Sequence, residues 1–99
     1  MGNRSDLQKI LEEIADNVYY QPPSGMNIRY PAIIYTRRRI DNLNASNNVY
    51  IQNLSYTITV IDRKPDSEIV EKVSRLPGCK HDTHYIYDGL NHDTFTIYY

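Results

Sequence analysis

The longest regular pattern in the chain, at residues 49–61, alternates apolar and polar side chains. A period of two puts the apolar positions on one face of a β-strand and the polar positions on the other. The apolar positions are Tyr50, Leu54, Tyr56, Ile58 and Val60, and Asn, Ser or Thr occupy positions 53, 55, 57 and 59. The segment therefore predicts a long strand with one face in the core, which requires partner strands and a covering layer.

A partner strand is predicted from residue 32 to about residue 39, because this segment is rich in β-branched and aromatic residues. Between the two strands, residues 41–48 are polar, rich in Asn and without periodicity. This connection is too long for a tight turn. We therefore expect a long hairpin loop that carries function or is disordered.

Capping and turn residues locate the other elements. Ser5 and Gln8 form a capping box, and Pro65 suits the first position of a second helix. Asp88 and Gly89 suit the turn of a C-terminal hairpin. Helices are expected over about 6–16 and from 65 to about 76, and further strands at 18–21, 83–87 and 94–99.

The expected element order is α-β-β-β-α-β-β, in the α+β class. The expected architecture is an antiparallel β-sheet with two helices packed on one face and a long β-hairpin. The 99 residues are enough for a single domain, 1–99, with one modest core.

Charge and cysteine content exclude several functional classes. Eleven basic and twelve acidic side chains give a formal net charge of -1, so no overall field draws the protein to DNA or to an anionic membrane. Cys79 is the only cysteine, which excludes an intramolecular disulfide and a Cys-rich zinc site. Without a signal-peptide pattern or an apolar run of roughly 18 residues, the chain is expected to be soluble and made in the cytosol.

Three adjacent arginines, Arg37, Arg38 and Arg39, end the predicted 32–39 strand. Strand alternation is expected to place Arg37 and Arg39 on one face and Arg38 on the other. The triplet could be a solvated strand end that prevents edge aggregation, an ion-pairing contact to another subunit, or a contact to passing DNA. The neighbouring Asp41 supplies a counter-charge, which weakens a purely nucleic-acid interpretation.

The sequence contains no recognised catalytic or metal-binding pattern. His81 and His84 are three residues apart on an expected strand, hence on opposite faces, and no His-Glu-x-x-His motif occurs. His92 is expected to tie the turn that starts at Asp88, and Cys79 to be a small buried side chain. Phosphate-binding glycine patterns are also missing. We therefore expect a protein that is not an enzyme and has no cofactor or metal.

Tyrosine supplies ten of the eleven aromatic side chains. Its large ring and polar hydroxyl suit half-exposed sheet faces and protein interfaces. Tyr35 and Tyr56 beside the arginines also match an RNA-binding sheet in outline, but the glycine-aromatic signature of such sheets is missing. As a set, the tyrosines favour a protein interface.

Five segments carry a similarity to a known family: YPAIIY at 30–35, YTITVID at 56–62, PDSEI at 65–69, LPGC at 76–79 and DGLNHDTFTIYY at 88–99. With them the chain resembles tail terminators, the head-to-tail joining proteins of long-tailed, siphovirus-type bacteriophages and prophages of Gram-positive hosts. The similarity covers nearly the whole chain, and the last segment is its most specific part. Gly89 departs from the family, which more often has Asn there, but either residue accepts a left-handed turn.

The resemblance implies a structural protein of virion assembly, made in the host bacterial cytoplasm and located at the head-tail interface of the virion. Terminators form hexameric rings that cap the tail tube, stop its polymerisation and join the tail to the head connector. The implied partners are further copies of the chain, the tail tube protein, the connector or stopper protein, and genomic DNA in the channel. The alternatives are a head-completion or stopper protein of the connector and a small nucleic-acid-binding module.

The resemblance also implies roles for individual residues. The hairpin loop would become ordered against the tube or the connector, and the arginines at its base would form ion pairs between subunits or rings. The predicted subunit or partner interface comprises Arg37, Arg38, Arg39, Asp41, Asn42, Leu43, Asn44, Asn47, Asn48, Tyr50, Tyr98 and Tyr99.

Overall fold

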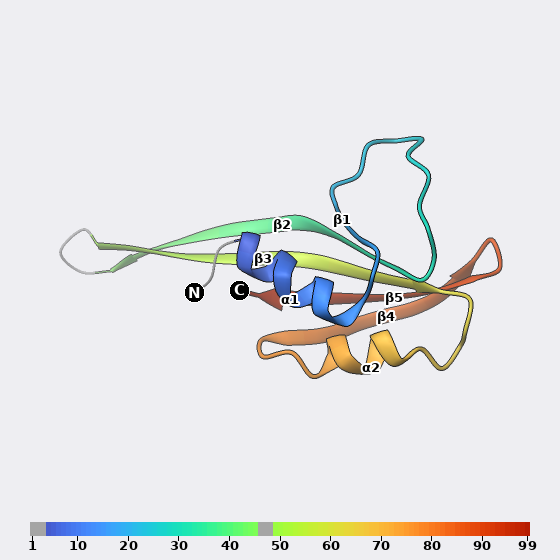
Figure 1. Ribbon diagram of the computed structural model, residues 1–99. Coiled ribbons are helices and arrows are strands. Elements are labelled where there is room, and N and C mark those ends of the chain that lie inside the picture. Colours follow the sequence, from blue (N-terminus) through green and yellow to red (C-terminus); the bar gives the residue numbers. More distant parts are fainter. Residues whose placement is uncertain (1–3, 46–48) are drawn as a thin grey trace.

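The structure is a computed structural model that describes residues 4–45 and 49–99, with side chains described only outside 39–53 (Figure 1). In chain order its elements are α1 (Arg4–Ile14), β1 (Val18–Tyr20), β2 (Ala32–Ala45), β3 (Val49–Asp62), α2 (Glu68–Ser74), β4 (Cys79–Tyr87) and β5 (Leu90–Tyr98). Two helices and one five-stranded sheet confirm the predicted α+β class.

The sheet is mixed, so the prediction of an antiparallel sheet is wrong at one edge. The strand order is β1-β2-β3-β5-β4, which places β3 at the centre. β3 runs antiparallel to β2 and β5, and β4 to β5, but β1 runs parallel to β2 with Val18 opposite Ile33. The cause is the connection 21–31, which leaves the end of β1 and returns to the start of β2 as a crossover (Figure 1).

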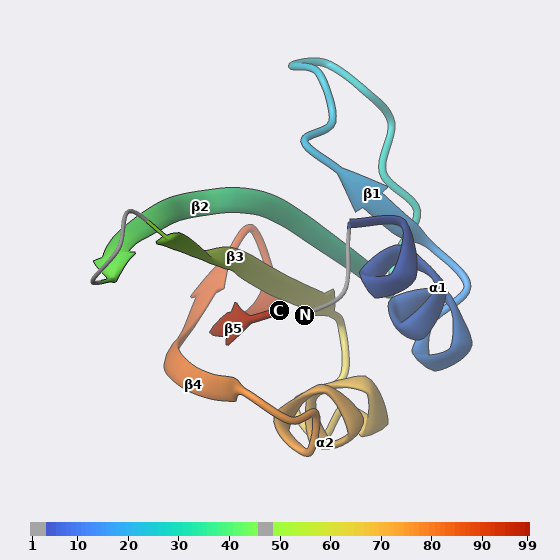
Figure 2. The same ribbon diagram turned by 90° about the vertical axis from the view of Figure 1, so that its left-hand side faces the viewer.

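Both helices cover the same face of the sheet (Figure 2). α1 buries Leu7 and Leu11 completely, and α2 buries Val73. Beneath them lie buried side chains from three strands: Ile33, Tyr35, Tyr56, Ile58, Val60, Phe95 and Ile97. This set drives folding, because burial of one large apolar side chain contributes roughly 1.5–3 kcal/mol.

Tyr35 links the helix layer to the sheet. Its side chain is fully buried, with its ring centroid 4.8 Å from that of Tyr20 and 6.0 Å from that of Tyr56. Its hydroxyl donates a hydrogen bond to Gln8 Oε1 and accepts one from Arg4 Nη1 at 3.3 Å. The guanidinium of Arg4 also lies over the Tyr20 ring, 4.4 Å from its centroid. Polar contacts therefore fix α1 on the sheet in addition to its leucine packing.

Both helices begin at other residues than predicted. α1 already includes Arg4, so Ser5 lies inside the helix and the predicted capping box is wrong. α2 begins at Glu68, because Ser67 keeps the extended backbone of an N-cap residue, with φ -75° and ψ 126°. Pro65 therefore lies outside the helix. Helical spacing identifies the buried stripes, whereas the local backbone geometry decides where a helix starts.

The C-terminal hairpin has the predicted turn and longer strands. Asp88 and Gly89 have φ values of 54° and 74°, the left-handed conformation that a two-residue hairpin turn needs. β4 begins at Cys79 and β5 at Leu90, several residues before the predicted starts. The additional residues show no clear alternation of apolar and polar side chains, so the sequence pattern does not identify them. They belong to the strands because their backbones pair across the hairpin.

The predicted long loop at 41–48 is wrong in its extent. β2 continues to Ala45 and β3 begins at Val49. Backbone pairing across the hairpin outweighs the low strand propensity of Asp and Asn, which depends strongly on context. We call residues 40–45 together with 49–54 the arm. It projects from the body in Figure 1, and the molecule measures 52 × 27 × 23 Å.

Replacement of Tyr35 by Phe is expected to lower the free energy of unfolding by about 1–3 kcal/mol, because Gln8 and Arg4 lose a buried hydrogen-bond partner while the ring packing stays. Tyr98, which is 54% exposed, provides the control. Tyr98→Phe should stay within about 0.5 kcal/mol of the wild type. Urea unfolding followed by circular dichroism measures both variants, and equal effects would contradict the anchoring role of the Tyr35 hydroxyl.

Gly78→Ala is expected to destabilise the protein more than Gly25→Ala. Both glycines have positive φ, 76° and 84°, so each substitution costs about 1–2 kcal/mol of backbone strain. Only at Gly78 would the new Cβ lie 2.7 Å from the Tyr98 carbonyl oxygen, which should add roughly 1–3 kcal/mol. Thermal unfolding of the two variants measures the difference. Equal melting temperatures would show that the end of β5 moves aside freely.

Candidate interaction surfaces

A β-bulge in β2 decides how the arginines are presented. Arg37 lies opposite Tyr56, and Arg39 lies opposite Ser55, with Arg38 as the additional residue between them. Arg37 therefore has a register position on the helix-covered face, and Arg39 does not. The predicted common face of Arg37 and Arg39 is wrong, because an extra residue shifts the alternation by one. Arg37 and Arg38 are exposed, and neither forms an ion pair with a residue that the structure describes.

The other predicted interface residues of the hairpin lie in the arm or outside the described residues. The backbones of Arg39, Asp41, Asn42, Leu43, Asn44 and Tyr50 belong to β2 or β3. Asn47 and Asn48 lie outside the described residues. β1 pairs with β2 no further than Tyr35, and β5 pairs with β3 only from Ser55 onward. Apart from one backbone hydrogen bond at Leu54, the base of the arm, the two arm strands therefore pair only with each other among the described residues.

The two C-terminal tyrosines of the predicted interface have different surroundings. Tyr98 ends β5 with an exposed side chain, and its backbone N–H donates to the Gly78 carbonyl at 3.0 Å. Tyr99 packs partly against the core, and its N–H donates to the Leu54 carbonyl at 3.1 Å. Tyr98 is thus accessible to a partner, whereas Tyr99 attaches the chain end to the base of the arm.

β4 is an exposed strand at the edge of the sheet. It is the last strand in the order, and eight of its nine residues are exposed. Tyr85, Ile86 and Tyr87 are 45%, 67% and 70% exposed. His92 stacks on Tyr85 with ring centroids 4.8 Å apart, and its Nδ1 donates to the Leu90 carbonyl at 3.0 Å, which fits its expected structural role. An exposed edge with large apolar side chains is a typical site for association with another chain.

A second bulge, at Asp82 of β4, brings two histidines to one face. His81 and His84 both have register positions on the helix-covered face, opposite Phe95 and Asp93. The prediction that they lie on opposite faces is wrong, because the extra residue at the bulge shifts the alternation by one and puts both on the same face. The Asp82 carboxylate accepts a hydrogen bond of 2.6 Å from the Thr96 hydroxyl on β5, which stabilises the bulge.

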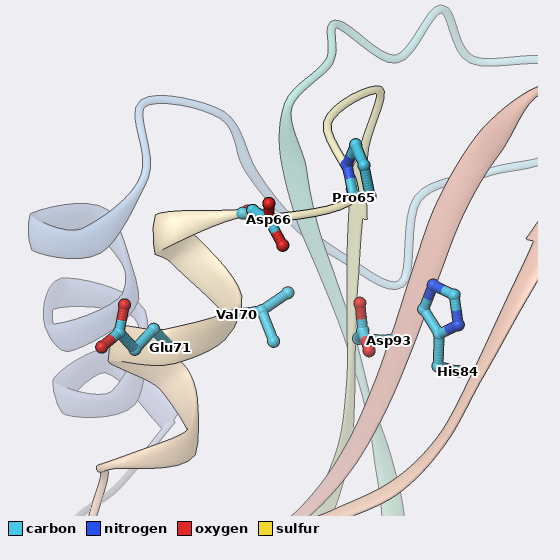
Figure 3. Close-up of a pocket in the computed structure, with 7 residues that line it drawn as sticks. Pro65, Asp66, Val70, Glu71, His84 and Asp93 are labelled. Carbon is cyan, nitrogen blue, oxygen red and sulfur yellow. The ribbon is translucent and has the colours of Figure 1, made fainter.

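Beside these histidines, α2, its preceding turn and the β4–β5 pair form an open pocket of about 540 Å³ (Figure 3). Its lining residues are Pro65, Asp66, Ser67, Val70, Glu71, His84 and Asp93. Asp93 is only 9% exposed, and its Oδ1 lies 3.1 Å from His81 Nε2. His84 Nε2 lies 3.2 Å from Asn91 Oδ1. Three carboxylates make this pocket acidic, and one of them is buried.

The acceptors of the pocket are incompletely paired. Glu71 forms an ion pair with Arg75 at 2.7 Å, but Asp66 has no ion pair with any described residue. Ser67 is 8% exposed, and its Oγ has no hydrogen-bond partner among the residues that the structure describes. Because buried polar atoms normally have partners, this wall of the pocket is suited to an external hydrogen-bond donor or cation. The described His, Cys, Asp and Glu side chains contain no group of three placed to hold a metal ion.

The sequence alone does not indicate this pocket. A bulge adds one residue without a clear compositional signal, so periodicity cannot place His81 and His84 together. Asp66 and Asp93 line the same pocket only because the turn before α2 folds back beside the β4–β5 pair. The one local signal is Ser67, a residue type that favours the N-cap position and so marks the start of α2.

Cys79 begins β4 and is only partly buried against the core, so the expected buried side chain is confirmed in part. Burial, and to a lesser degree the negative charge of Asp82, raises the pKa of its thiol to about 11. The thiol is therefore protonated at neutral pH and a weak nucleophile.

Comparison with known proteins leaves the surfaces as the main source of functional information. No protein-family model matches the chain, and no curated protein is significantly similar to it in sequence. Among the described residues, neither helix is long and apolar enough to cross a membrane.

Ionisation of Cys79 is expected to make the protein less stable at alkaline pH. The unfolded thiol ionises near its ordinary pKa of about 8.5, whereas the folded thiol stays protonated up to a pKa of about 11. The stability that depends on the protonated thiol is therefore fully present below about pH 8.5 and is lost as the pH rises toward 11. Urea unfolding of the wild type and of Cys79→Ala at neutral pH and near pH 10 measures it. The wild type should lose more stability than the variant over this interval, and an equal loss would refute the prediction.

Proposed function

We propose that the protein is a tail terminator, a structural component of virion assembly. It forms a hexameric ring, caps the tail tube, stops its polymerisation and joins the tail to the head connector. The observation that carries this proposal is the arm, whose strands, beyond the base at Leu54, pair only with each other among the described residues. A two-stranded ribbon alone is at best marginally stable in water, so contact with a partner would stabilise it.

The edge of β4 supports the same function. Subunits of a ring contact a neighbour on each side, so each subunit needs two association surfaces. β4 offers a strand edge together with the exposed Tyr85, Ile86 and Tyr87. The arm and β4 lie on different sides of the body, so one can meet the tube or the connector while the other meets a neighbouring subunit (Figure 1).

On this proposal the protein works through complementary surfaces and without a chemical reaction. Arg37 and Arg38, exposed near the base of the arm, form ion pairs to neighbouring subunits or rings. Tyr98 contributes an exposed ring at the end of β5. A stopper protein of the connector would use surfaces of the same kind, so the binding partner distinguishes the two functions.

The proposal predicts binding to the ends of tail tubes. The purified protein is mixed with tail tube protein from the same phage genome and, separately, with its connector. Native mass spectrometry and negative-stain microscopy should show six-copy rings at tube ends and tubes that stop growing. Binding to the connector alone would identify a stopper. Unassociated monomers at every concentration, with both partners, would refute both functions.

A shortened arm provides the matched control for this experiment. Replacement of residues 42–52 by an Asn-Gly turn removes most of the arm and keeps β2 and β3 in register, because the flanking Asp41 and Asn53 already lie opposite each other. The variant should keep the wild-type circular dichroism spectrum and lose tube capping. Full capping by the folded variant would show that the arm is not the docking element.

A further inference from the structure

The acidic pocket and the exposed arginines of β2 have complementary chemistry. A guanidinium carries five hydrogen-bond donors and no acceptor, in a planar arrangement that matches carboxylates. The pocket presents the opposite set, with acceptors from Asp66, Ser67 and Asp93. Its volume of about 540 Å³ accommodates a guanidinium together with water.

Ser67 is the observation that points to an external donor. Its side chain lines the pocket and is more than nine-tenths buried, yet its Oγ has no partner among the described residues. A buried hydroxyl without a partner is unfavourable, so an incoming N–H group would be favoured there. Asp93 uses Oδ1 toward His81, which leaves its other carboxylate oxygen as a further acceptor.

Arg37 and Arg38 are suitable occupants because no residue that the structure describes forms an ion pair with them. Both side chains are exposed. Arg37 has its register position on the helix-covered face, which is also the face that bears the pocket. Arginine suits this site better than lysine, because its fixed fork can contact a carboxylate and a hydroxyl together.

The two surfaces lie at opposite edges of the sheet. Arg37 is on β2, beside the β1 edge, whereas the pocket lies against β5 and the edge strand β4. Complementary surfaces at opposite edges of one subunit produce head-to-tail association, which closes into a ring when the rotation between subunits is suitable. This arrangement favours a second copy of this chain as the occupant of the pocket.

We propose that the acidic pocket of one copy binds the Arg37 guanidinium of the next copy, with Arg38 beside the carboxylate of Asp66 at the rim. This inference rests on the proposed ring and identifies the contact between its subunits. The Arg37 guanidinium donates to the Asp93 carboxylate, and rotation of the Ser67 side chain about its Cα–Cβ bond brings the buried Oγ within its reach.

Charge reversal tests this contact. The variant Arg37→Glu/Arg38→Glu and the variant Asp66→Lys should each weaken self-association about 100-fold, because each puts like charges together. The control variants are Arg29→Glu, another exposed arginine, and Glu68→Lys, a neighbour of the pocket that does not line it. Both controls should assemble as the wild type does.

Mixing and recombination separate this contact from a general charge effect. An equimolar mixture of the two reversed variants should form complexes that neither forms alone, because each supplies the surface that the other lacks. The variant that combines all three substitutions should regain part of the lost association. Native mass spectrometry and sedimentation velocity at low salt measure the assemblies, and circular dichroism confirms that each variant is folded.

The outcomes distinguish this inference from the proposed function. If the reversed variants assemble and cap tubes as the wild type does, the pocket contact is wrong and the terminator function stands. If the wild type self-associates through the pocket but ignores tubes and connector, the contact stands and the terminator function fails. A wild type that stays monomeric alone and with both partners overturns both.

Discussion

The buried Tyr35 side chain is the contact on which the layers of this protein depend. Its ring lies between Tyr20 and Tyr56, and its hydroxyl contacts Gln8 and Arg4, so three strands and α1 meet at one side chain. Burial raises the pKa of Tyr35 above its ordinary value and keeps the hydroxyl protonated as a donor. A smaller or purely apolar side chain would leave the polar groups of α1 without this attachment.

Because both helices cover the same face, the core uses only that face and the accessible surfaces lie at the periphery. The arm extends beyond the strands that could support it, β4 ends the sheet, and the acidic pocket lies between α2 and the β4–β5 pair. These features contribute only partly buried side chains, Leu54, Cys79 and Val70, to the margin of the core. Their arrangement around the edges suits a protein that is surrounded by partners.

Two single-residue bulges account for most of the difference between the expected and the observed surfaces. Alternation correctly identified the buried positions Tyr56, Ile58 and Val60, because burial acts on each of them through the same period of two. It failed at Arg38 and Asp82, where one extra residue changes the parity of all that follows. The predicted start of α2 was wrong for a related reason. The spacing of its buried residues identifies the helix, but the start depends on the local backbone conformation of Ser67.

The sequence by itself determined the class of the fold, the buried strand face and the left-handed turn at Asp88-Gly89, because each depends on local propensity or on a regular period. Only the tertiary structure decided that β1 runs parallel to β2, that the hairpin forms an arm, and that Asp66 and Asp93 share a pocket. These features arise from pairings between segments that are distant in the chain, and a local sequence pattern does not indicate how favourable such pairings are.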